Sequence, residues 1–295
     1  MKKLKKFFAV CLAMVLMGTM LASCGSSDEG EGDAGAAGGA IHVVTREEGS
    51  GTRGAFIELF GIEVKDDAGE KVDKTIETAE VTNSTSVMMQ TIAGNESAIG
   101  YISLGSLDDS VKALKVDGVE ATPENVKSGD YKVSRPFNIV TKEKVSEATQ
   151  DFINYIMSEE GQALVSEDYI SQGNEGTFES NGAKGEVTVS GSSSVTPLMQ
   201  KLAEEYMKVN PDVKINVQQS DSTTGVTDAI EGISDIGMAS REVSDEELAQ
   251  GVTAKAIALD GIAVIVNLNN GLEDIAAKSV MGIYIGTITD WADVK

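Results

Sequence analysis

The chain contains 295 residues, carries a formal net charge of −23 and has 41% hydrophobic residues. So acidic a chain does not favour nucleic acid as a partner, because its charge repels the phosphate backbone. Its two cysteines, Cys11 and Cys24, both lie within the first two dozen residues. The remainder therefore has no thiol for a disulfide or for redox chemistry.

The N-terminus has the composition of a secretory signal. Four lysines precede the apolar run FFAVCLAMVLMGTML, which is too short for a good membrane-spanning helix. The run ends at LASC, which resembles the bacterial lipobox, whose cysteine is lipidated and becomes the mature N-terminus. We expect a signal peptide over residues 1–23 and a fatty-acid anchor, such as palmitate, on Cys24. A chance cysteine in an ordinary signal is the alternative.

Residues 24–40 contain mostly Gly, Ala, Ser and acidic residues, which predict a flexible tether at the extracytoplasmic face of the membrane. The folded body begins near Ile41 and is long enough for two medium-sized lobes. Removal of the four signal lysines lowers the net charge to −27. A small anion remains a possible ligand, because an enclosed site depends on its local donors and on one or two arginines.

Short β-rich runs alternate with helical patterns along the body. The β-rich runs are IHVVT, AIGYISL, FNIVTK, EVTVSG, VKINVQQ and AIALDGIAVIVN. This alternation predicts an α/β fold with mixed sheets and flanking helices. One helix is well defined over 196–209, because Pro197 suits its first turn and NPD at 210–212 ends it. Polar and glycine-rich residues at about 171–185 predict a linker.

A weak internal repeat relates residues 84–92 to residues 222–230, and in both copies a Gly and then an Ile-Gly pair follow. Similar patterns of an apolar residue followed by glycine recur by chance in α/β proteins. The repeat therefore leaves two readings open, a coincidence or two similar lobes.

Three stretches share one design, in which a strand is followed by hydroxyl and Gly residues and then by a helix. They are TREEGSGTRGAF, SGSSSVTPL and QQSDSTTGVTDAI. A helix N-terminus presents unpaired backbone N–H groups and the positive end of the helix dipole, which together bind anions. Helix capping by Ser or Thr explains each stretch taken alone. Together, with Arg46 and Arg53 beside the first stretch, they predict an oxyanion site.

Other chemistries are poorly supported by the sequence. None of the three stretches has the spacing of a Walker loop or of a dinucleotide-binding loop, and no Cys–His cluster suggests a metal site. The single histidine, His42, lies in an expected strand, so that a serine hydrolase would lack an obvious base. We expect no catalytic residues and no cofactor. A lipoprotein hydrolase of phosphate esters is the alternative from another class.

At these motifs the sequence resembles the phosphate-binding lipoproteins of bacterial phosphate ABC importers, members of the type II periplasmic binding proteins. The resemblance covers nearly all of residues 41–295 and rests on REEGSGTRGAF, AIGYISLG, YKVSRPF, SGSSSVTPLMQKLAEEY, SDIGMASRE, IALDGIAVIVN and GTITDWADV. It implies two lobes with a ligand cleft between them, inorganic phosphate as the ligand and an ABC permease as the partner, in a monomer that does not alter its ligand. Another tetrahedral oxyanion such as sulfate is the alternative ligand.

The order of the motifs differs from that of the family, in which GSSSVTPL opens the mature chain and ITDWADV runs into VVTREEG. We interpret the order as a circular permutation, and a rearranged gene is the rival explanation. The resemblance then implies one lobe from residues 41–131 and 268–295, a second lobe from 143–258, and hinge strands at 132–142 and 259–267.

The resemblance also implies which residues bind phosphate. Arg46 would pair with phosphate oxygens, because a guanidinium offers paired donors to a tetrahedral anion. A surface arginine paired with Glu47 or Glu48 is the alternative. The other implied ligand residues are Ser50, Gly51 and Thr52 on the same lobe, and Ser194, Val195 and Ser222 on the opposite lobe.

Two positions depart from the family pattern. One is Asp221, which stands where a glycine often precedes the serine, and the other lies in the turn GMASRE. Many members have an aspartate after their GAS turn, where it accepts the proton of hydrogen phosphate. The corresponding turn of this chain reads GMASRE and has Ser240 and Arg241 in that region. Arg241 would add a cation to the site, and Asp221 or Glu242 would have to accept the proton. Discrimination between phosphate and sulfate is therefore the less secure part of the prediction.

Overall fold

The computed structural model describes residues 38–295. The expected signal peptide, the lipid anchor on Cys24 and residues 24–37 of the tether lie outside the described residues. Within residues 38–295, no helix is long and apolar enough to cross a membrane.

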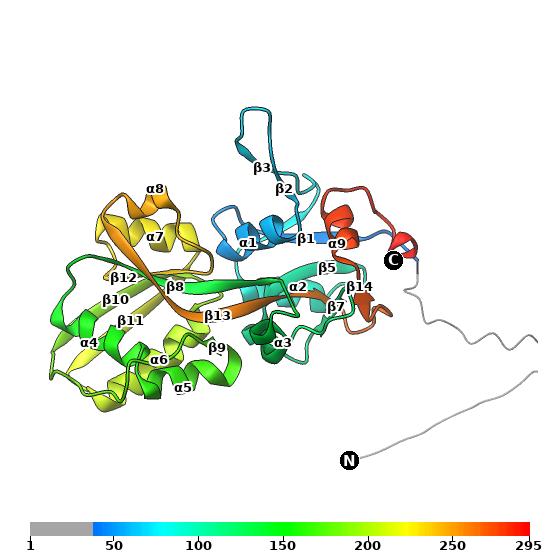
Figure 1. Ribbon diagram of the computed structural model, residues 1–295. Helices are drawn as coiled ribbons and strands as arrows, with labels where there is room; N and C mark the ends of the chain where they lie inside the picture. Colours follow the sequence, from blue (N-terminus) through cyan, green and yellow to red (C-terminus); the bar gives the residue numbers. More distant parts are fainter. Residues whose placement is uncertain (1–37) are drawn as a thin grey trace, which may run out of the picture. The chain divides into compact units, whose positions relative to one another are not determined.

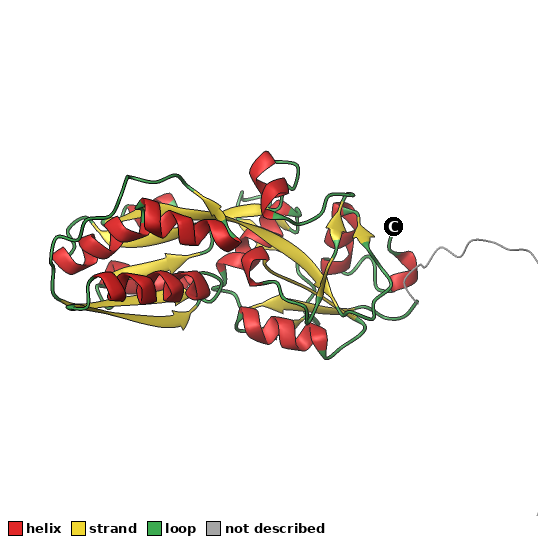
Figure 2. Ribbon diagram, turned by 90° about the horizontal axis from the view of Figure 1, so that it is seen from below, coloured by secondary structure: helices red, strands yellow, loops and turns green. Residues whose placement is uncertain are grey.

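The described residues form a mixed α/β fold with a curled sheet and flanking helices, which confirms the predicted fold class (Figures 1 and 2). The strands are β1 (His42–Arg46), β2 (Glu63–Lys65), β3 (Lys71–Asp73), β4 (Glu80–Thr82), β5 (Ala98–Ser103), β6 (Lys112–Ala113), β7 (Lys115–Val116), β8 (Ser134–Lys142), β9 (Ile170–Ser171), β10 (Gly185–Ser192), β11 (Val213–Ser220), β12 (Ile236–Ala239), β13 (Val252–Val266) and β14 (Asp274–Ile275). The helices are α1 (Gly51–Leu59), α2 (Thr85–Ala93), α3 (Pro123–Ser128), α4 (Glu147–Ile156), α5 (Glu159–Asp168), α6 (Thr196–Val209), α7 (Ser222–Glu231), α8 (Asp245–Leu248) and α9 (Ala277–Tyr284). Short 3-10 turns lie at η1 (Leu104–Ser106) and η2 (Trp291–Asp293).

Two long antiparallel strands, β8 and β13, run side by side through the described chain (Figure 1). β8 also pairs with β12, and β13 also pairs with β5. The pairing of β8 with β13 therefore joins the sheets of two lobes. We call these the β1 lobe, which contains β1, β4 and β5 with α1, α2 and α9, and the β10 lobe, which contains β10, β11 and β12 with α4 to α7.

The two lobes have the same strand order. It reads β4-β1-β5-β13 in the β1 lobe and β11-β10-β12-β8 in the β10 lobe. The first three strands of each series are parallel and the fourth is antiparallel. Helix α2 links the outer strand to the third strand in one lobe, and α7 does so in the other. The repeated segments 84–92 and 222–230 thus lie at equivalent places, which favours the reading of two similar lobes.

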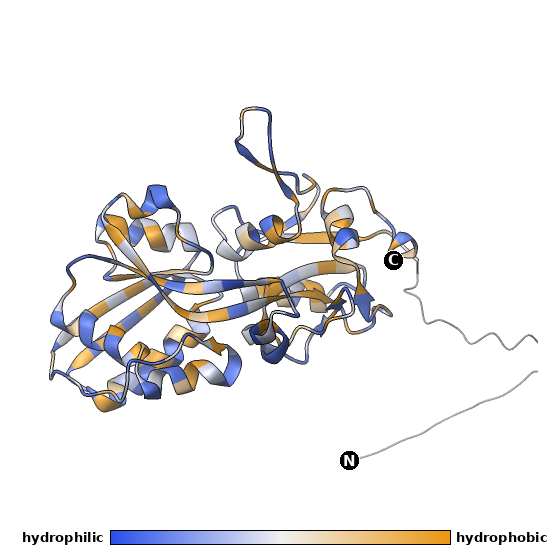
Figure 3. Ribbon diagram, in the orientation of Figure 1, coloured by the Kyte–Doolittle hydropathy of each residue, from blue (hydrophilic) through white to orange (hydrophobic). Residues whose placement is uncertain are grey.

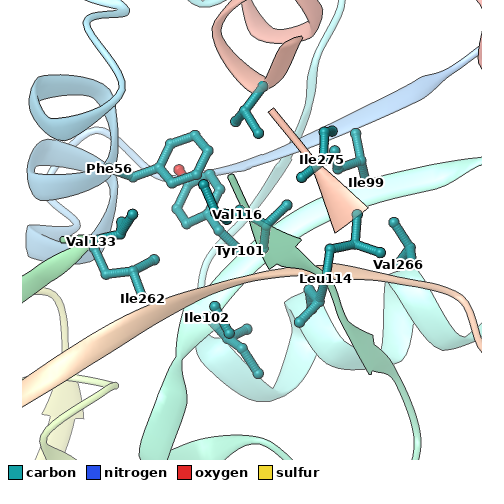
Figure 4. Close-up of a cluster of buried hydrophobic side chains, with 14 of the residues drawn as sticks. Phe56, Ile99, Tyr101, Ile102, Leu114, Val116, Val133, Ile262, Val266 and Ile275 are labelled. Atoms are coloured by element: carbon teal, nitrogen blue, oxygen red, sulfur yellow. The ribbon is translucent and has the colours of Figure 1, made fainter. Parts of the chain in front are cut away.

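Aromatic and aliphatic side chains from α1 and the central strands form the core of the β1 lobe (Figure 4). Phe56 of α1 stacks on Tyr101 of β5, with ring centroids 3.9 Å apart, and both side chains are fully buried. β1 and β13 are largely hydrophobic in Figure 3, whereas α3 and the β2–β3 hairpin are largely hydrophilic. This core holds the first turn of α1 at the end of β1.

Helix α6 of the β10 lobe has the bounds that the sequence predicts, with Pro197 in its first turn and Asn210 as its C-cap. Residues 145–165 have one continuous helical pattern in the sequence, but the helix divides at Ser158. The Oγ of Ser158 accepts a hydrogen bond from Gly161 N at 3.1 Å, and α5 begins there. A Cβ at Gly161 would lie 2.1 Å from the carbonyl oxygen of Tyr155, so that only glycine permits this close turn.

The segment expected as a linker at about 171–185 is fixed to the helices that it crosses. The buried carboxylate of Asp151 on α4 accepts hydrogen bonds from Ser180 Oγ and Asn181 N, both at 2.8 Å. It also accepts bonds from Tyr206 and Asn210 at the end of α6. The linker therefore packs as part of the β10 lobe.

The start of the described chain lies beside its end. Ile41 N donates to Thr289 O, and Trp291 N donates to Gly39 O, both at 2.9 Å. These bonds bring residues 39–41 and 289–291 together at one end of the β1 lobe.

Candidate anion-binding site

Seven buried Ser and Thr side chains gather where the two lobes meet. Each is at most 5% exposed, although each carries a polar hydroxyl. We call this set the hydroxyl cluster. Its members are Thr52 and Thr85 from the β1 lobe, and Ser192, Ser193, Ser194, Ser222 and Ser240 from the β10 lobe.

Hydrogen bonds within the cluster cross from one lobe to the other. Thr52 Oγ1 lies 2.8 Å from Ser194 Oγ, and Thr85 Oγ1 lies 3.3 Å from the same atom. Ser240 Oγ accepts from Ser192 Oγ at 3.0 Å and lies 3.3 Å from Ser222 Oγ. The backbone also bridges the lobes, since Thr223 N donates to Gly49 O at 3.2 Å. The lobes are therefore in direct contact at the cluster.

Four helices begin at the cluster. The side chains of Ser50, Ser84 and Asp221 cap α1, α2 and α7 by accepting a backbone N–H. Among the described residues, no side chain caps α6, which begins after Val195. The unpaired N–H groups and positive dipole ends of these helices favour an anion there.

Sequence analysis identified three of these four helix starts and missed α2 with Thr85. The internal repeat carried the signal, because it aligns the start of α2 with the start of α7.

Arg46 lies at the end of β1 and is 1% exposed. Its backbone N donates to the hydroxyl of Tyr101 at 3.1 Å, and burial raises the pKa of Tyr101 to about 12, so that the phenol stays neutral. Nη2 donates to Glu47 at 2.6 Å and to Ser193 Oγ at 3.0 Å. Arg46 therefore pairs with Glu47, as the alternative expected, but it is a buried residue that reaches the hydroxyl cluster and not a surface arginine.

One donor of this guanidinium is left over. Nη1 of Arg46 is buried and has no hydrogen-bond partner within residues 38–295. A buried donor of a charged group without a partner is costly, so that an anion at this place would remove a penalty.

A second buried arginine, Arg135 on β8, also reaches the cluster. Its Nη2 donates to Thr52 Oγ1 at 3.0 Å, and its Nη1 donates to the carboxylate of Asp260 on β13. Burial raises the pKa of Asp260, and the charge of Arg135 opposes this rise. Sequence analysis placed both residues in hinge strands and missed their part in the site. The signal was a charged residue of opposite sign in each crossover strand, Arg135 beside Pro136 and Asp260 within an apolar run.

Arg241 and the two expected proton acceptors lie elsewhere. Arg241 pairs with Glu247 at 2.8 Å, and its Nη2 lies 3.3 Å from Thr223 Oγ1, so that its charge is used within the β10 lobe. Asp221 accepts from Thr224 N and Thr224 Oγ1 as the cap of α7. Glu242 is exposed. The structure brings none of these three side chains into the hydroxyl cluster.

Two hollows flank the hydroxyl cluster. One of about 440 Å³ is lined by Thr85 and Ser193 together with residues of α2 and Gln219. The other, of about 530 Å³, is lined by Arg135 and Arg241 together with residues of α1 and α8. Over residues 38–295, no group of three or more His, Cys, Asp or Glu side chains is placed to hold a metal ion.

Two lobes joined by two crossover strands, with buried hydroxyls and arginines where the lobes meet, define a bilobed solute-binding protein. A family model described as "PBP superfamily domain" matches residues 27–160 and 176–295. The phosphate-binding protein PstS 2 of Streptococcus agalactiae is 52% identical over 297 residues, and the match covers 100% of both chains. The chain therefore belongs to the PstS family of phosphate-binding proteins within the PBP superfamily, as its motifs predict.

Two further matches show how far the likeness extends. A crystal structure of the phosphate-binding protein of a phosphate ABC transporter from Streptococcus pneumoniae matches with a TM-score of 0.70 and 45% identity, over 87% of this chain and 100% of that one. The phosphate-binding protein PstS of Bacillus subtilis is 38% identical over 117 residues, which is 38% of each chain.

Proposed function

We propose that the protein binds inorganic phosphate between its two lobes and delivers it to the permease of an ABC importer. The names of its relatives support this function, and one observation in the structure carries it. The buried Nη1 of Arg46 has no partner within residues 38–295, and the same guanidinium bonds to the hydroxyl cluster. A tetrahedral oxyanion offers the acceptors that these donors require.

The proposed ligand residues come from both sides of the cleft. Arg46 supplies the charge, and the start of α1 supplies backbone N–H groups and a hydroxyl from Thr52. The start of α6 lies directly after Val195, whose N–H donates to Ser192 O at 3.1 Å, and no described side chain caps the N–H groups of the helix itself. The full proposed set is Arg46, Ser50, Gly51, Thr52, Ser194, Val195, Ser222 and Ser240. Arg241 is left out, because Glu247 holds it.

The hydroxyl cluster also bears on the choice between phosphate and sulfate. A Ser or Thr hydroxyl accepts a hydrogen bond as well as donating one. The cluster can therefore accept the proton of hydrogen phosphate without a free carboxylate, and it can equally donate every bond to sulfate. We propose phosphate as the ligand, with sulfate as the necessary comparison in every titration.

We propose that binding occurs without turnover. Hydrolysis by an activated serine needs a general base beside the hydroxyl. His42 lies at the opposite end of β1 from Arg46 and pairs with Glu80 at 2.7 Å, and its side chain is 39% exposed. A phosphate ester should therefore release no phosphate in the presence of the purified protein.

A lipid anchor on Cys24, an extracytoplasmic location and a monomeric state complete the proposal. The lipobox at residues 21–24 and the charged, apolar start of the chain support the first two. Mass spectrometry of the membrane fraction would show a diacylated N-terminal cysteine if Cys24 is the anchor.

We also propose that the chain is circularly permuted relative to longer-known members of its family. The S. agalactiae relative aligns end to end and therefore shares the present order, whereas the B. subtilis relative aligns over only 38% of each chain. When two chains carry the same two halves in opposite order, a linear alignment can match only one of the halves. Residues 39–41 lie beside 289–291, which fits a loop opened at this place. A chain re-cut to begin near residue 182, with Lys295 joined to Ile41, should fold and bind the same ligand.

Calorimetric titration of the purified protein tests the proposed function. Saturable heat with phosphate at about one site per chain is the expected result, and the sulfate titration measures how far the site discriminates between the two anions. The absence of binding to either anion by a folded sample would overturn it.

A further inference from the structure

A buried ion pair sits where the two crossover strands pair with each other. Arg135 of β8 and Asp260 of β13 are opposite one another in the antiparallel register. Their side chains are 3% and 1% exposed. The proposed phosphate contacts do not use either residue.

The guanidinium of Arg135 reaches acceptors on both sides of the cleft. Nη2 donates to Thr52 Oγ1 in the β1 lobe at 3.0 Å, and Nε donates to Ser240 O in the β10 lobe at 3.2 Å. Nη1 donates to Asp260 and to Gly261 O, which keeps the side chain fixed on the crossover strands. A rotation of one lobe about β8 and β13 has to break the bond to Thr52 or the bond to Ser240.

Asp260 anchors this arrangement on one side. Its Oδ1 accepts from Gly105 N at 3.2 Å, within the turn that follows β5. The ring of Phe137 lies on the other side of the guanidinium, 5.0 Å from its central carbon. Both contacts hold Arg135 in one orientation, in which its remaining donors point across the cleft.

We propose that Arg135 is a positioning residue that couples closure of the lobes to anion binding, by fixing Thr52 in the hydroxyl cluster while Asp260 holds the guanidinium in place. This inference rests on the proposed function. Thr52 then presents its hydroxyl to the ligand only when Arg135 bonds both lobes. The predicted consequence is a slower release of the ligand rather than a faster capture.

Only arginine fits this role. Its planar guanidinium has five N–H donors, and at Arg135 these donors bond to four acceptors that lie in different directions. A lysine ammonium could pair with Asp260, but its single nitrogen could not also reach Thr52 and the carbonyl of Ser240. Arg135→Lys therefore removes the coupling and keeps the buried charge pair.

The control is Lys112→Gln. Lys112 of β6 pairs with Glu273 at 2.7 Å and donates to Asn270 O, so that its bonds stay within the β1 lobe and away from the hydroxyl cluster. Its substitution therefore removes an ion pair without altering a bond between the lobes.

Calorimetry and stopped-flow release of phosphate test the proposal. Arg135→Lys should weaken phosphate binding by about tenfold or more, with the change in the dissociation rate, since a hydrogen bond to a charged group is lost. Lys112→Gln should stay within about twofold of the unaltered protein, as expected for the loss of a partly exposed ion pair on one lobe. An unchanged Kd and release rate in folded Arg135→Lys, even with a lower Tm, would overturn the proposal. A change confined to the association rate would overturn it as well.

A second variant tests the proposal if Arg135→Lys does not fold. The double substitution Arg135→Gln with Asp260→Asn removes both charges together, so that no lone charge is left buried. It should show the same faster release. If the unaltered protein binds phosphate and both variants match it, the coupling is wrong and the proposed function stands. If the unaltered protein binds no phosphate, the proposed function itself fails.

Discussion

Replacement of Gly51 by alanine should block the closed arrangement of the lobes while leaving each lobe intact. A Cβ at Gly51 would lie 2.5 Å from Ser222 Oγ and 2.9 Å from Ser240 Oγ, both in the opposite lobe. These distances are far below van der Waals contact, and the neighbouring atoms belong to buried side chains. The added methyl group therefore has room only if the hydroxyls of Ser222 and Ser240 rotate out of the cluster or the lobes move apart, and either change disturbs the site.

The magnitude follows from the cost of overpacking. Extra methyl groups in a well-packed region cost about 1–3 kcal/mol. Because this cost falls on the closed state alone, phosphate affinity should fall by about 5- to 150-fold. Stability should not fall, because alanine favours the helix over glycine by up to about 1 kcal/mol.

Gly54→Ala is the matched control. Gly54 lies in the same helix, and a Cβ there would meet no atom within 4 Å. Calorimetry should give weak phosphate binding for Gly51→Ala and native binding for Gly54→Ala, and both should keep the native Tm or exceed it. Native affinity in Gly51→Ala, or an equal loss in both variants, would refute the reasoning.

Three further substitutions are expected to have distinct effects. Arg46→Lys keeps a charge but loses the paired donors, so that phosphate affinity measured by calorimetry should fall by about tenfold or more; native affinity would exclude Arg46 as a ligand. Phe56→Ala removes the ring that stacks on Tyr101, and the free energy of unfolding in urea should fall by about 3–5 kcal/mol; a loss below about 1 kcal/mol would contradict the core packing. Burial alone would raise the pKa of Asp151, but the hydrogen bonds from Asn181, Ser180 and their neighbours outweigh burial and lower the pKa. The ionised carboxylate therefore stabilises the fold above its ordinary pKa, and this stabilisation is lost as the pH falls. Asp151→Asn should therefore lose about 1–3 kcal/mol at neutral pH and less near pH 3, with unchanged phosphate affinity; a deficit independent of pH would contradict this.

Local sequence signals predicted the fold class and much of the cluster. The strand, hydroxyl and helix pattern is a local one, so that Thr52, Ser194 and Ser222 could be identified before their relative positions were known. Pro197 and Asn210 set the bounds of α6 in the same local way.

The parts that escaped prediction depend on which partner a side chain takes, and for Arg135 these partners are distant in the sequence. Nothing near Arg135 in sequence shows that it bonds to Thr52, Ser240 and Asp260, because these partners are 83 to 125 residues away. Arg241 pairs with Glu247, six residues later, which the capping box of α8 holds in place. The Ser-x-x-Glu pattern at 244–247 predicts this helix start but does not show that Arg241 pairs with its glutamate. The division of the long helical pattern at Ser158 also went unseen, because Ser in a helical pattern does not by itself end a helix.

A crystal structure of the protein grown with phosphate tests the central claim most directly. The account predicts a tetrahedral ion between the lobes, within hydrogen-bond distance of Arg46 Nη1 and of hydroxyls from both Thr52 and Ser194. An ion bound elsewhere, or a site between the lobes that stays without phosphate at a saturating concentration, would contradict the account.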